Sequence, residues 1–257
     1  MHLNDPIAVM DSGAGGLSVL SALRELLPQE DYLYFGDNAN APYGEKPLAE
    51  VRRLTFAAVE GLLSRKPKAL VVACNTATSA AISALRETYP DLPIIGLEPA
   101  LKPAVSQHPG GRILVMATPL TIREEKFIRL LGLYRRQAEI LPLPCPGLAE
   151  YIEQGHLDDE ILAAYLRNLF SPCLQAPLDG LVLGCTHYPL IIPALRRQLG
   201  DSLCFYEGGV GAAKETKRRL AEVALLKPEN NKGKVEFTCS GDNAFLLALA
   251  KKLDLTN

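Results

Sequence analysis

The amino-acid sequence predicts an α/β fold made of two similar domains, each with a mainly parallel sheet flanked by helices. Short apolar runs alternate with segments of helical periodicity along most of the 257 residues, which is the pattern of βαβ units. In addition, Cys74 and Cys185 stand in matched settings, each at the end of an apolar run. This repetition indicates two halves of similar organisation, with an active site in the cleft between them.

The predicted strands are the apolar runs at 7–10, 33–35, 69–73, 93–95, 113–117, 181–183, 204–206 and 235–239. The predicted helices lie between most of them, at 17–27, 48–63, 76–89, 124–131, 159–170, 190–199 and 211–226. A glycine and two prolines interrupt the pattern between Gly96 and Pro103 and mark a boundary there. We therefore expect a first domain of residues 1–96 and 207–257, and a second domain of residues 97–206.

The composition is that of an ordinary soluble globular protein, with 22% charged residues and a formal net charge of -2. No polybasic run is present to bind nucleic acid or membrane headgroups, so both partners are disfavoured. The first residues lack the basic and apolar regions of a signal peptide, and no later stretch approaches about 18 uninterrupted apolar residues. We therefore expect a cytoplasmic protein.

The six cysteines are scattered without CxxC pairs, which predicts free thiols in a reducing compartment. There are only four histidines, and only the neighbours Cys185 and His187 bring a histidine near a cysteine in the sequence, so we expect no metal site. Four cysteines lack polar neighbours of the kind that follow Cys74 and Cys185, and we assign them to packing: Cys145, Cys173, Cys204 and Cys239.

Cys74 and Cys185 are the strongest candidates for chemistry. A single buried cysteine most often behaves as a small hydrophobic residue, but both of these are followed by polar residues and a helix-like stretch. The carboxyl ends of parallel strands are where open α/β sheets bind ligands, and helix N-terminal amides favour a thiolate. Two such edges facing one another predict a thiol on either side of a small molecule, the arrangement that two-base proton transfer requires.

Two loops follow predicted strands. In the first, residues 11–16, Ser12 and helix-start amides can bind an anion, or Asp11 or Ser12 can cap the next helix. It is neither a P-loop nor a GxGxxG fingerprint. The second, residues 36–44, either lines a polar pocket with Asp37 and the Tyr43 hydroxyl or is a plain turn-rich loop.

Two further residues have alternative interpretations. His187 can act as a general acid, tune Cys185 or cap the following turn, and its position leaves a Cys-His hydrolase open. By composition alone, Glu153 is an ordinary surface carboxylate.

Together these motifs resemble the glutamate racemases, cofactor-independent members of the aspartate/glutamate racemase family that supply D-glutamate for peptidoglycan. The resemblance spans nearly the whole chain. It rests on residues 11–16, 36–37 with 42–44, 73–77, 117–118 with Thr121, and 184–190. The last motif separates the chain from aspartate racemases, which tend to carry a glutamate at the position of His187.

The resemblance implies roles for individual residues. Cys74 and Cys185 become the acid/base pair, facing D-glutamate and L-glutamate respectively, and Asp11, Glu153 and His187 assist them. The residues implied in substrate binding are Asp11, Ser12, Tyr43, Gly44, Asn75, Thr76, Thr118, Thr121, Thr186 and His187. The resemblance further implies no cofactor, a homodimer, and a role in cell wall biogenesis and cell shape.

Three departures from the family pattern concern loops rather than catalytic residues. Asn40 stands where members often carry arginine, the stretch 96–99 is one residue short, and residues 206–209 replace a frequent Asp-Ser-Gly. Three other functions stay open: a racemase for aspartate or another amino acid, a cysteine hydrolase, and a non-catalytic amino-acid-binding protein.

Overall fold

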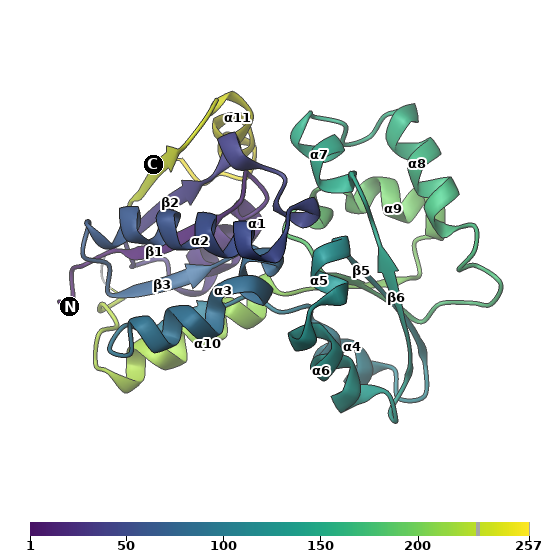
Figure 1. The fold of residues 1–257 in the computed structure, drawn as a ribbon, viewed down its shortest axis with the longest axis horizontal. Helices are drawn as coiled ribbons and strands as arrows, with labels where there is room; N and C mark the ends of the chain where they lie inside the picture. Colours follow the sequence, from purple (N-terminus) through teal and green to yellow (C-terminus); the bar gives the residue numbers. More distant parts are fainter. Residues whose placement is uncertain (230–231, 257) are drawn as a thin grey trace.

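The computed structural model describes residues 1–229 and 232–256, and it contains two parallel sheets that lie side by side in separate lobes (Figure 1). The first sheet has the strand order β4-β3-β1-β2-β9, and the second has the order β6-β5-β7-β8. Every pair of neighbouring strands in these sheets is parallel. The predicted α/β fold with two parallel-sheet domains is therefore confirmed.

The strands of the first sheet are β1 (Ile7–Asp11), β2 (Tyr32–Gly36), β3 (Ala69–Val72), β4 (Ile94–Gly96) and β9 (Val235–Cys239). Those of the second sheet are β5 (Arg112–Ala117), β6 (Glu139–Pro144), β7 (Gly180–Leu183) and β8 (Cys204–Glu207). The apolar pattern does not predict β6, which contains Pro142 and Pro144. Proline cannot donate a ladder hydrogen bond and is tolerated here because β6 is an edge strand.

The helices of the first lobe are α1 (Leu17–Leu26), α2 (Leu48–Leu63), α3 (Asn75–Thr88), α10 (Gly209–Glu222) and α11 (Ala244–Lys252). Those of the second lobe are α4 (Leu101–Gln107), α5 (Pro119–Arg123), α6 (Glu125–Tyr134), α7 (Leu148–Glu153), α8 (Glu160–Phe170) and α9 (Ile192–Leu199). Short 3₁₀ turns are η1 (Asn38–Asn40), η2 (Tyr43–Glu45) and η3 (Tyr188–Ile191). No helix within residues 1–229 and 232–256 has the length and apolar character that a membrane crossing requires.

The C-terminal segment returns to the first lobe. After β8 the chain re-enters that lobe as α10, and β9 then pairs with β2, with Tyr32 opposite Val235 and Gly36 opposite Cys239. Figure 1 shows α11 and the C-terminal end in the same lobe as the N-terminus. The predicted limit at 206 falls one residue early, because Glu207 pairs with Leu183 in the second sheet, and we propose the domain limits 1–96 with 208–257, and 97–207.

Both faces of the first sheet are buried. Along β1, Val9 contributes to the core that α1 covers, whereas Met10 contributes to the core beneath α2 and α3. Successive side chains of a strand point to opposite faces, so a strand covered on both sides must be apolar throughout. This explains why β3 and β7, the strands that precede Cys74 and Cys185, are continuous apolar runs, and why polar residues appear only after each strand ends.

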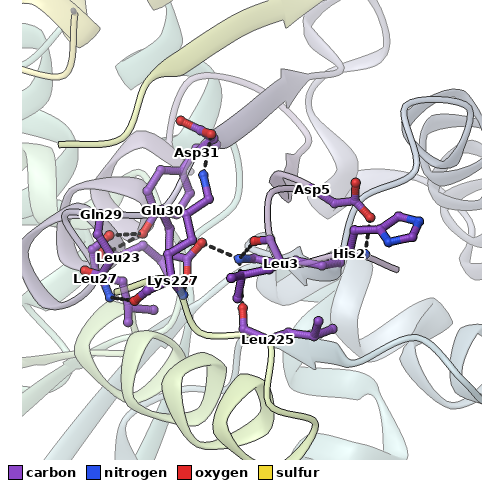
Figure 2. Close-up of polar contacts among 12 residues, drawn as sticks. His2, Leu3, Asp5, Leu23, Leu27, Gln29, Glu30, Asp31, Leu225 and Lys227 are labelled. Atoms are coloured by element: carbon purple, nitrogen blue, oxygen red, sulfur yellow. Dashed lines mark hydrogen bonds and ion pairs between the residues drawn. The ribbon is translucent and has the colours of Figure 1, made fainter. Parts of the chain in front are cut away.

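A buried ion pair stabilises the edge of the first lobe opposite the strand ends that carry the cysteines. Lys68 Nζ lies 2.5 Å from Glu30 Oε2, and neither side chain has exposed surface. The same ammonium donates to the carbonyl oxygens of Leu3 and Leu225, at 2.7 Å and 2.8 Å. Figure 2 shows Glu30 to one side of these two chain segments, with Lys227 next to it. Through these hydrogen bonds, Lys68 holds the N-terminal segment and the segment after α10 against the start of β3.

Candidate active site

Cys74 and Cys185 line one cavity of about 200 Å³. Cys74 lies two residues after β3 and Cys185 two residues after β7, so each sheet contributes one thiol from the carboxyl end of a central strand. Only 5% of Cys74 and 9% of Cys185 is exposed. Two protected thiols from different domains thus face the same small space.

Both domains contribute to the cavity wall. The residues with a predicted role that line it are Ser12, Tyr43, Gly44, Cys74, Thr76, Thr118, Glu153, Cys185 and His187. Four others are buried outside this lining: Asp11, Asn75, Thr121 and Thr186. The predicted residues therefore divide into nine that line the cavity and four that lie behind its lining.

Cys74 is the N-cap of α3 and accepts hydrogen bonds from two neutral donors. The Ser12 hydroxyl and the Ala77 backbone N–H each lie 3.4 Å from its sulfur. Burial nevertheless raises the pKa of Cys74 to about 12, and the nearby Asp11 carboxylate adds to this rise. As expected, the Ala77 amide at the start of α3 lowers the pKa of this thiol, but the loss of water outweighs both hydrogen bonds, so the net shift of the pKa is upward.

Cys185 has a different partner. Its sulfur lies 3.6 Å from His187 Nδ1, and His187 Nε2 lies 2.5 Å from Glu153 Oε1. The helix predicted at 190–199 begins at Ile192 as α9, with a proline in its first turn, and η3 lies between it and Cys185. The polar environment of this thiol is therefore an imidazole backed by a carboxylate rather than a helix N-terminus.

The side chains of His187 and Glu153 form a charged pair. Burial opposes the charge on His187, but its hydrogen bonds to Cys185 and Glu153 hold its pKa well above the ordinary value. Burial also opposes the charge on Glu153, and the bonds from His187 and the Ala14 N–H lower its pKa below the ordinary value. The His187 side chain does not cap η3, so the capping interpretation is wrong, and Glu153 is not a surface carboxylate.

The glycine-rich loop after β1 binds a carboxylate of the protein itself. The Ala14 N–H donates to Glu153 Oε1 at 2.6 Å, which joins the two domains. A Cβ on Gly13 would fall 2.1 Å from the same oxygen, and one on Gly15 would fall 2.6 Å from His187 Nδ1. These glycines allow the second domain to approach closely. Ser12 donates to Cys74, and its side chain also lines the cavity.

Asp11 is fully buried beneath this loop. It accepts hydrogen bonds from the Gly13 N–H at 2.9 Å and from the Thr186 hydroxyl at 3.1 Å, and the second of these crosses between the domains. Burial raises its pKa, although the charge of His187 opposes the rise. The N-cap of α1 is Gly16 without a side-chain bond, so the capping interpretation of Asp11 and Ser12 is wrong.

Three threonine hydroxyls form a network at one end of the cavity. Thr76 Oγ1 lies 3.0 Å from Thr118 Oγ1 and 3.3 Å from Thr121 Oγ1, and Thr118 caps α5 by accepting from the Thr121 N–H. Nearby, the Asn75 side-chain oxygen is buried and has no hydrogen-bond partner among the described residues. Unpaired hydrogen-bonding capacity of this kind suits a polar ligand.

Tyr43 lines the cavity, but its hydroxyl is engaged elsewhere. It donates to Asp37 Oδ2 at 2.6 Å, and Asn40, one of the three departures, donates to both oxygens of the same carboxylate. A Cβ on Gly44 would lie 2.7 Å from Thr118, so a glycine is needed where the two domains meet. The loop 36–44 is therefore an ordered wall of the cavity rather than a plain turn.

The structure also corrects the assignment of the remaining cysteines. Cys145 is buried in the core but also lines the cavity, which its setting after a proline-rich strand did not indicate. Cys204 is exposed, so a packing role for it is wrong.

Other lining residues without a predicted role include Asn38, Glu45, Pro119 and Glu150. Within residues 1–229 and 232–256, no group of three or more His, Cys, Asp or Glu side chains is placed to hold a metal ion.

Comparison with known proteins finds relatives over nearly the whole chain. Residues 7–208 match the family model described as Asp/Glu/hydantoin racemase. A glutamate racemase from Clostridium botulinum (strain Langeland) is 48% identical over 254 residues, which cover 98% of each chain. A glutamate racemase isoform from Bacillus anthracis superposes with a TM-score of 0.85 at 31% identity, covering 98% of this chain and 94% of that one. Escherichia coli glutamate racemase, solved with L-glutamate and the activator UDP-MurNAc-Ala, has a TM-score of 0.83 at 30% identity, covering 97% and 95%.

Proposed function

This chain belongs to the Asp/Glu/hydantoin racemase family and is an amino-acid racemase, and we propose that it interconverts L- and D-glutamate. The resemblance seen in the sequence is thereby confirmed. The observation that carries the proposal is the pair of protected thiols, Cys74 and Cys185, one from each domain, at a single cavity. Full-length relatives that are glutamate racemases, one of them solved with L-glutamate, support the choice of substrate.

The proposed chemistry transfers two protons. With L-glutamate bound, a Cys185 thiolate removes the α-proton and becomes a thiol, and the electron pair of the broken C–H bond stays on the substrate. The Cys74 thiol then donates its proton to the opposite face and becomes a thiolate, which gives D-glutamate. The high pKa of Cys74 supports its starting role as a proton donor. The reverse reaction uses the same steps in the opposite order.

Supporting residues fall on both sides of the substrate. His187 contacts the Cys185 sulfur and can exchange a proton with it, while Glu153 holds the imidazole in place. Asp11 and Ser12 lie on the Cys74 side. We propose that the polar groups around the threonine network and the unpaired Asn75 oxygen bind the charged groups of the amino acid. The substrate-binding set is then Asp11, Ser12, Tyr43, Gly44, Asn75, Thr76, Thr118, Thr121, Thr186 and His187.

The proposed reaction also suggests a role for the protein in the cell. We propose a cytoplasmic, homodimeric enzyme that needs no cofactor and supplies D-glutamate for peptidoglycan, and thus for cell wall biogenesis and cell shape. The similarity of nearly the whole chain to glutamate racemases supports this proposal.

The contacts at Cys185 favour one second candidate. In a cysteine hydrolase, too, a thiol contacts an imidazole that in turn contacts a carboxylate, as Cys185, His187 and Glu153 do here. A hydrolase would form an acyl-enzyme on Cys185 and has no use for the second thiol. Mass spectrometry of the protein and of Cys185→Ala after incubation with a simple alkyl ester of glutamate distinguishes the two, because only a hydrolase accumulates an acyl adduct that depends on Cys185.

Proton NMR tests the proposal directly. The purified protein is incubated with D-glutamate in deuterated buffer without added cofactor, and the α-proton signal is followed together with optical rotation. Loss of both signals is expected. Retention of the α-proton in both enantiomers would contradict glutamate racemisation, and the same experiment with aspartate would then identify a racemase of different specificity.

A further inference from the structure

Asp37 is a buried carboxylate outside the cavity that holds the cavity wall in place. It is 4% exposed and begins the segment that contains Tyr43 and Gly44. Its oxygens accept hydrogen bonds from the Tyr43 hydroxyl at 2.6 Å, from the Asn40 side-chain amide at 3.0 Å and 3.1 Å, and from the Ser240 hydroxyl at 2.6 Å. Asp37 therefore joins the wall to a distant part of the chain.

Ser240 is 203 residues from Asp37 in the sequence and follows β9, the strand that pairs with β2. Its hydroxyl oxygen also accepts from the Ala39 N–H at 3.1 Å, and its own N–H donates to the Gly36 carbonyl at 3.1 Å. One residue of the C-terminal segment thus contacts the loop at three points. None of these contacts reaches the cavity, and Ser240 itself is exposed.

The chemistry at this position requires a carboxylate. The Asp37 side chain accepts hydrogen bonds from neutral donors, namely the hydroxyls of Tyr43 and Ser240 and the amide of Asn40. A carboxylate is an acceptor at both oxygens, whereas an asparagine would turn an N–H₂ group toward at least one of these donors. Hydrogen bonds to a charged group are also stronger than those between neutral groups. Asp37 therefore sets the direction of the Tyr43 hydroxyl and, with it, the position of the ring that lines the cavity.

We infer that Asp37 and Ser240 are positioning residues for the substrate-binding segment 42–44, and that the C-terminal segment thereby determines the shape of the substrate cavity. The inference rests on the proposed function in one respect, because the segment is taken to bind glutamate. Neither residue touches the substrate. Their effect is expected in the binding of substrate rather than in the proton transfer at the two thiols.

Ser240→Ala in the full chain is the central test, because it removes one donor to Asp37 at an exposed site and is expected to leave the protein folded. Thr238→Ala is the matched control: Thr238 lies in β9, two residues before Ser240, and is also exposed, but its hydroxyl donates to the Tyr34 carbonyl and not to the loop. We expect Ser240→Ala to raise the KM for both enantiomers about fivefold with little change in kcat, and Thr238→Ala to change neither.

Two further variants examine the same connection. Asp37→Asn and Tyr43→Phe are each expected to raise KM at least as much as Ser240→Ala. Adding Ser240→Ala to Asp37→Ala should have little further effect, because Asp37→Ala already leaves the Ser240 hydroxyl without its acceptor. Fully additive effects would show that Ser240 acts independently of Asp37 and would overturn the inference.

Hydrogen exchange of the substrate-free protein separates this inference from the proposed function. Peptides covering residues 38–46 should exchange about five- to tenfold faster in Ser240→Ala than in the wild type or in Thr238→Ala. If the protein does not racemise glutamate at all, the proposed function fails, and the exchange rates alone decide whether Ser240 anchors the loop. Unchanged exchange would overturn the inference, as would faster exchange with an unchanged KM in an active enzyme.

Discussion

Glu153 Oε1 and His187 Nε2 lie 2.5 Å apart, and the opposite nitrogen of the same imidazole faces the sulfur of Cys185. Glu153 ends α7, whereas His187 follows β7, so two separate elements of the second domain form the pair. The same carboxylate oxygen accepts from the Ala14 N–H of the first domain. Glu153 therefore connects the histidine that serves Cys185 to the loop that meets it from the other domain.

Glu153→Gln should lower the pKa of His187. Glutamine can still accept from the Ala14 N–H, but it lacks the negative charge that stabilises the imidazolium. Because the pKa of His187 is raised in the wild type, its ring stays protonated as the pH rises past 6.5, and in the variant it should lose its proton at lower pH. NMR titration of the histidine side chains measures this. Glu150→Gln, one turn earlier in α7, is the control, and an equal shift in both variants would contradict the pairing.

Cys74→Ala and Cys185→Ala should each reduce racemisation by roughly 10²–10⁴-fold, because each removes one of the two acid/base groups. Circular dichroism should show that both variants keep the fold. Cys145→Ala provides a matched control, since Cys145 is also a buried thiol at the cavity but its sulfur donates to the Leu143 carbonyl. Near wild-type turnover in either of the first two variants would refute the two-base assignment.

Cys74 should be a neutral thiol in the substrate-free protein throughout the neutral pH range. Burial raises its pKa to about 12, so the thiolate forms only as the pH approaches that value. The ultraviolet absorbance of thiolates, compared between wild type and Cys74→Ala, measures this. The difference spectrum should lack a thiolate band between about pH 6 and 9. A band at pH 7 would show that hydrogen bonds from Ser12 and Ala77 outweigh burial.

Gly13→Ala should reduce turnover on the order of 100-fold, because the new methyl group would displace the Glu153 carboxylate and shift the histidine beside Cys185. Gly61→Ala in α2 is the control: a Cβ there meets nothing within 4 Å. That variant should keep its activity and gain about 0.5–1 kcal/mol in the free energy of unfolding, since alanine favours a helix. Steady-state kinetics and urea denaturation measure both effects, and equal activity of the two variants would contradict the steric argument.

Lys68→Met should destabilise the fold by about 3–5 kcal/mol, because it leaves the Glu30 carboxylate buried without its cation. The double variant Lys68→Met with Glu30→Leu should recover much of that loss, since it removes both buried charges. Urea denaturation measures the free energies of unfolding. If the single variant were as stable as the wild type, the ion pair would not hold the N-terminal segment and the segment after α10 against β3.

Sequence reasoning recovered the continuous strands and failed where local signals were weak or mixed. The prolines in β6 interrupt the apolar pattern, so this edge strand was not predicted. The helix α7, which carries Glu153, is too short to show a helical period. The helix predicted to begin at residue 190 begins at Ile192, because apolar spacing does not distinguish the end of a 3₁₀ turn from the first turn of an α-helix. The role of Asp37 depends on Ser240, which no local pattern relates to it.

The sequence by itself determined that Cys74 and Cys185 end buried parallel strands, because a strand covered on both faces must be apolar and its first polar residues mark the sheet edge. Only the tertiary structure decided what surrounds each thiol. The Ala14 to Glu153 contact joins residues 139 apart, and the Thr186 to Asp11 contact joins residues 175 apart. Such contacts, and the burial that raises the pKa of Cys74, arise from how the two domains pack together, which no local sequence pattern records.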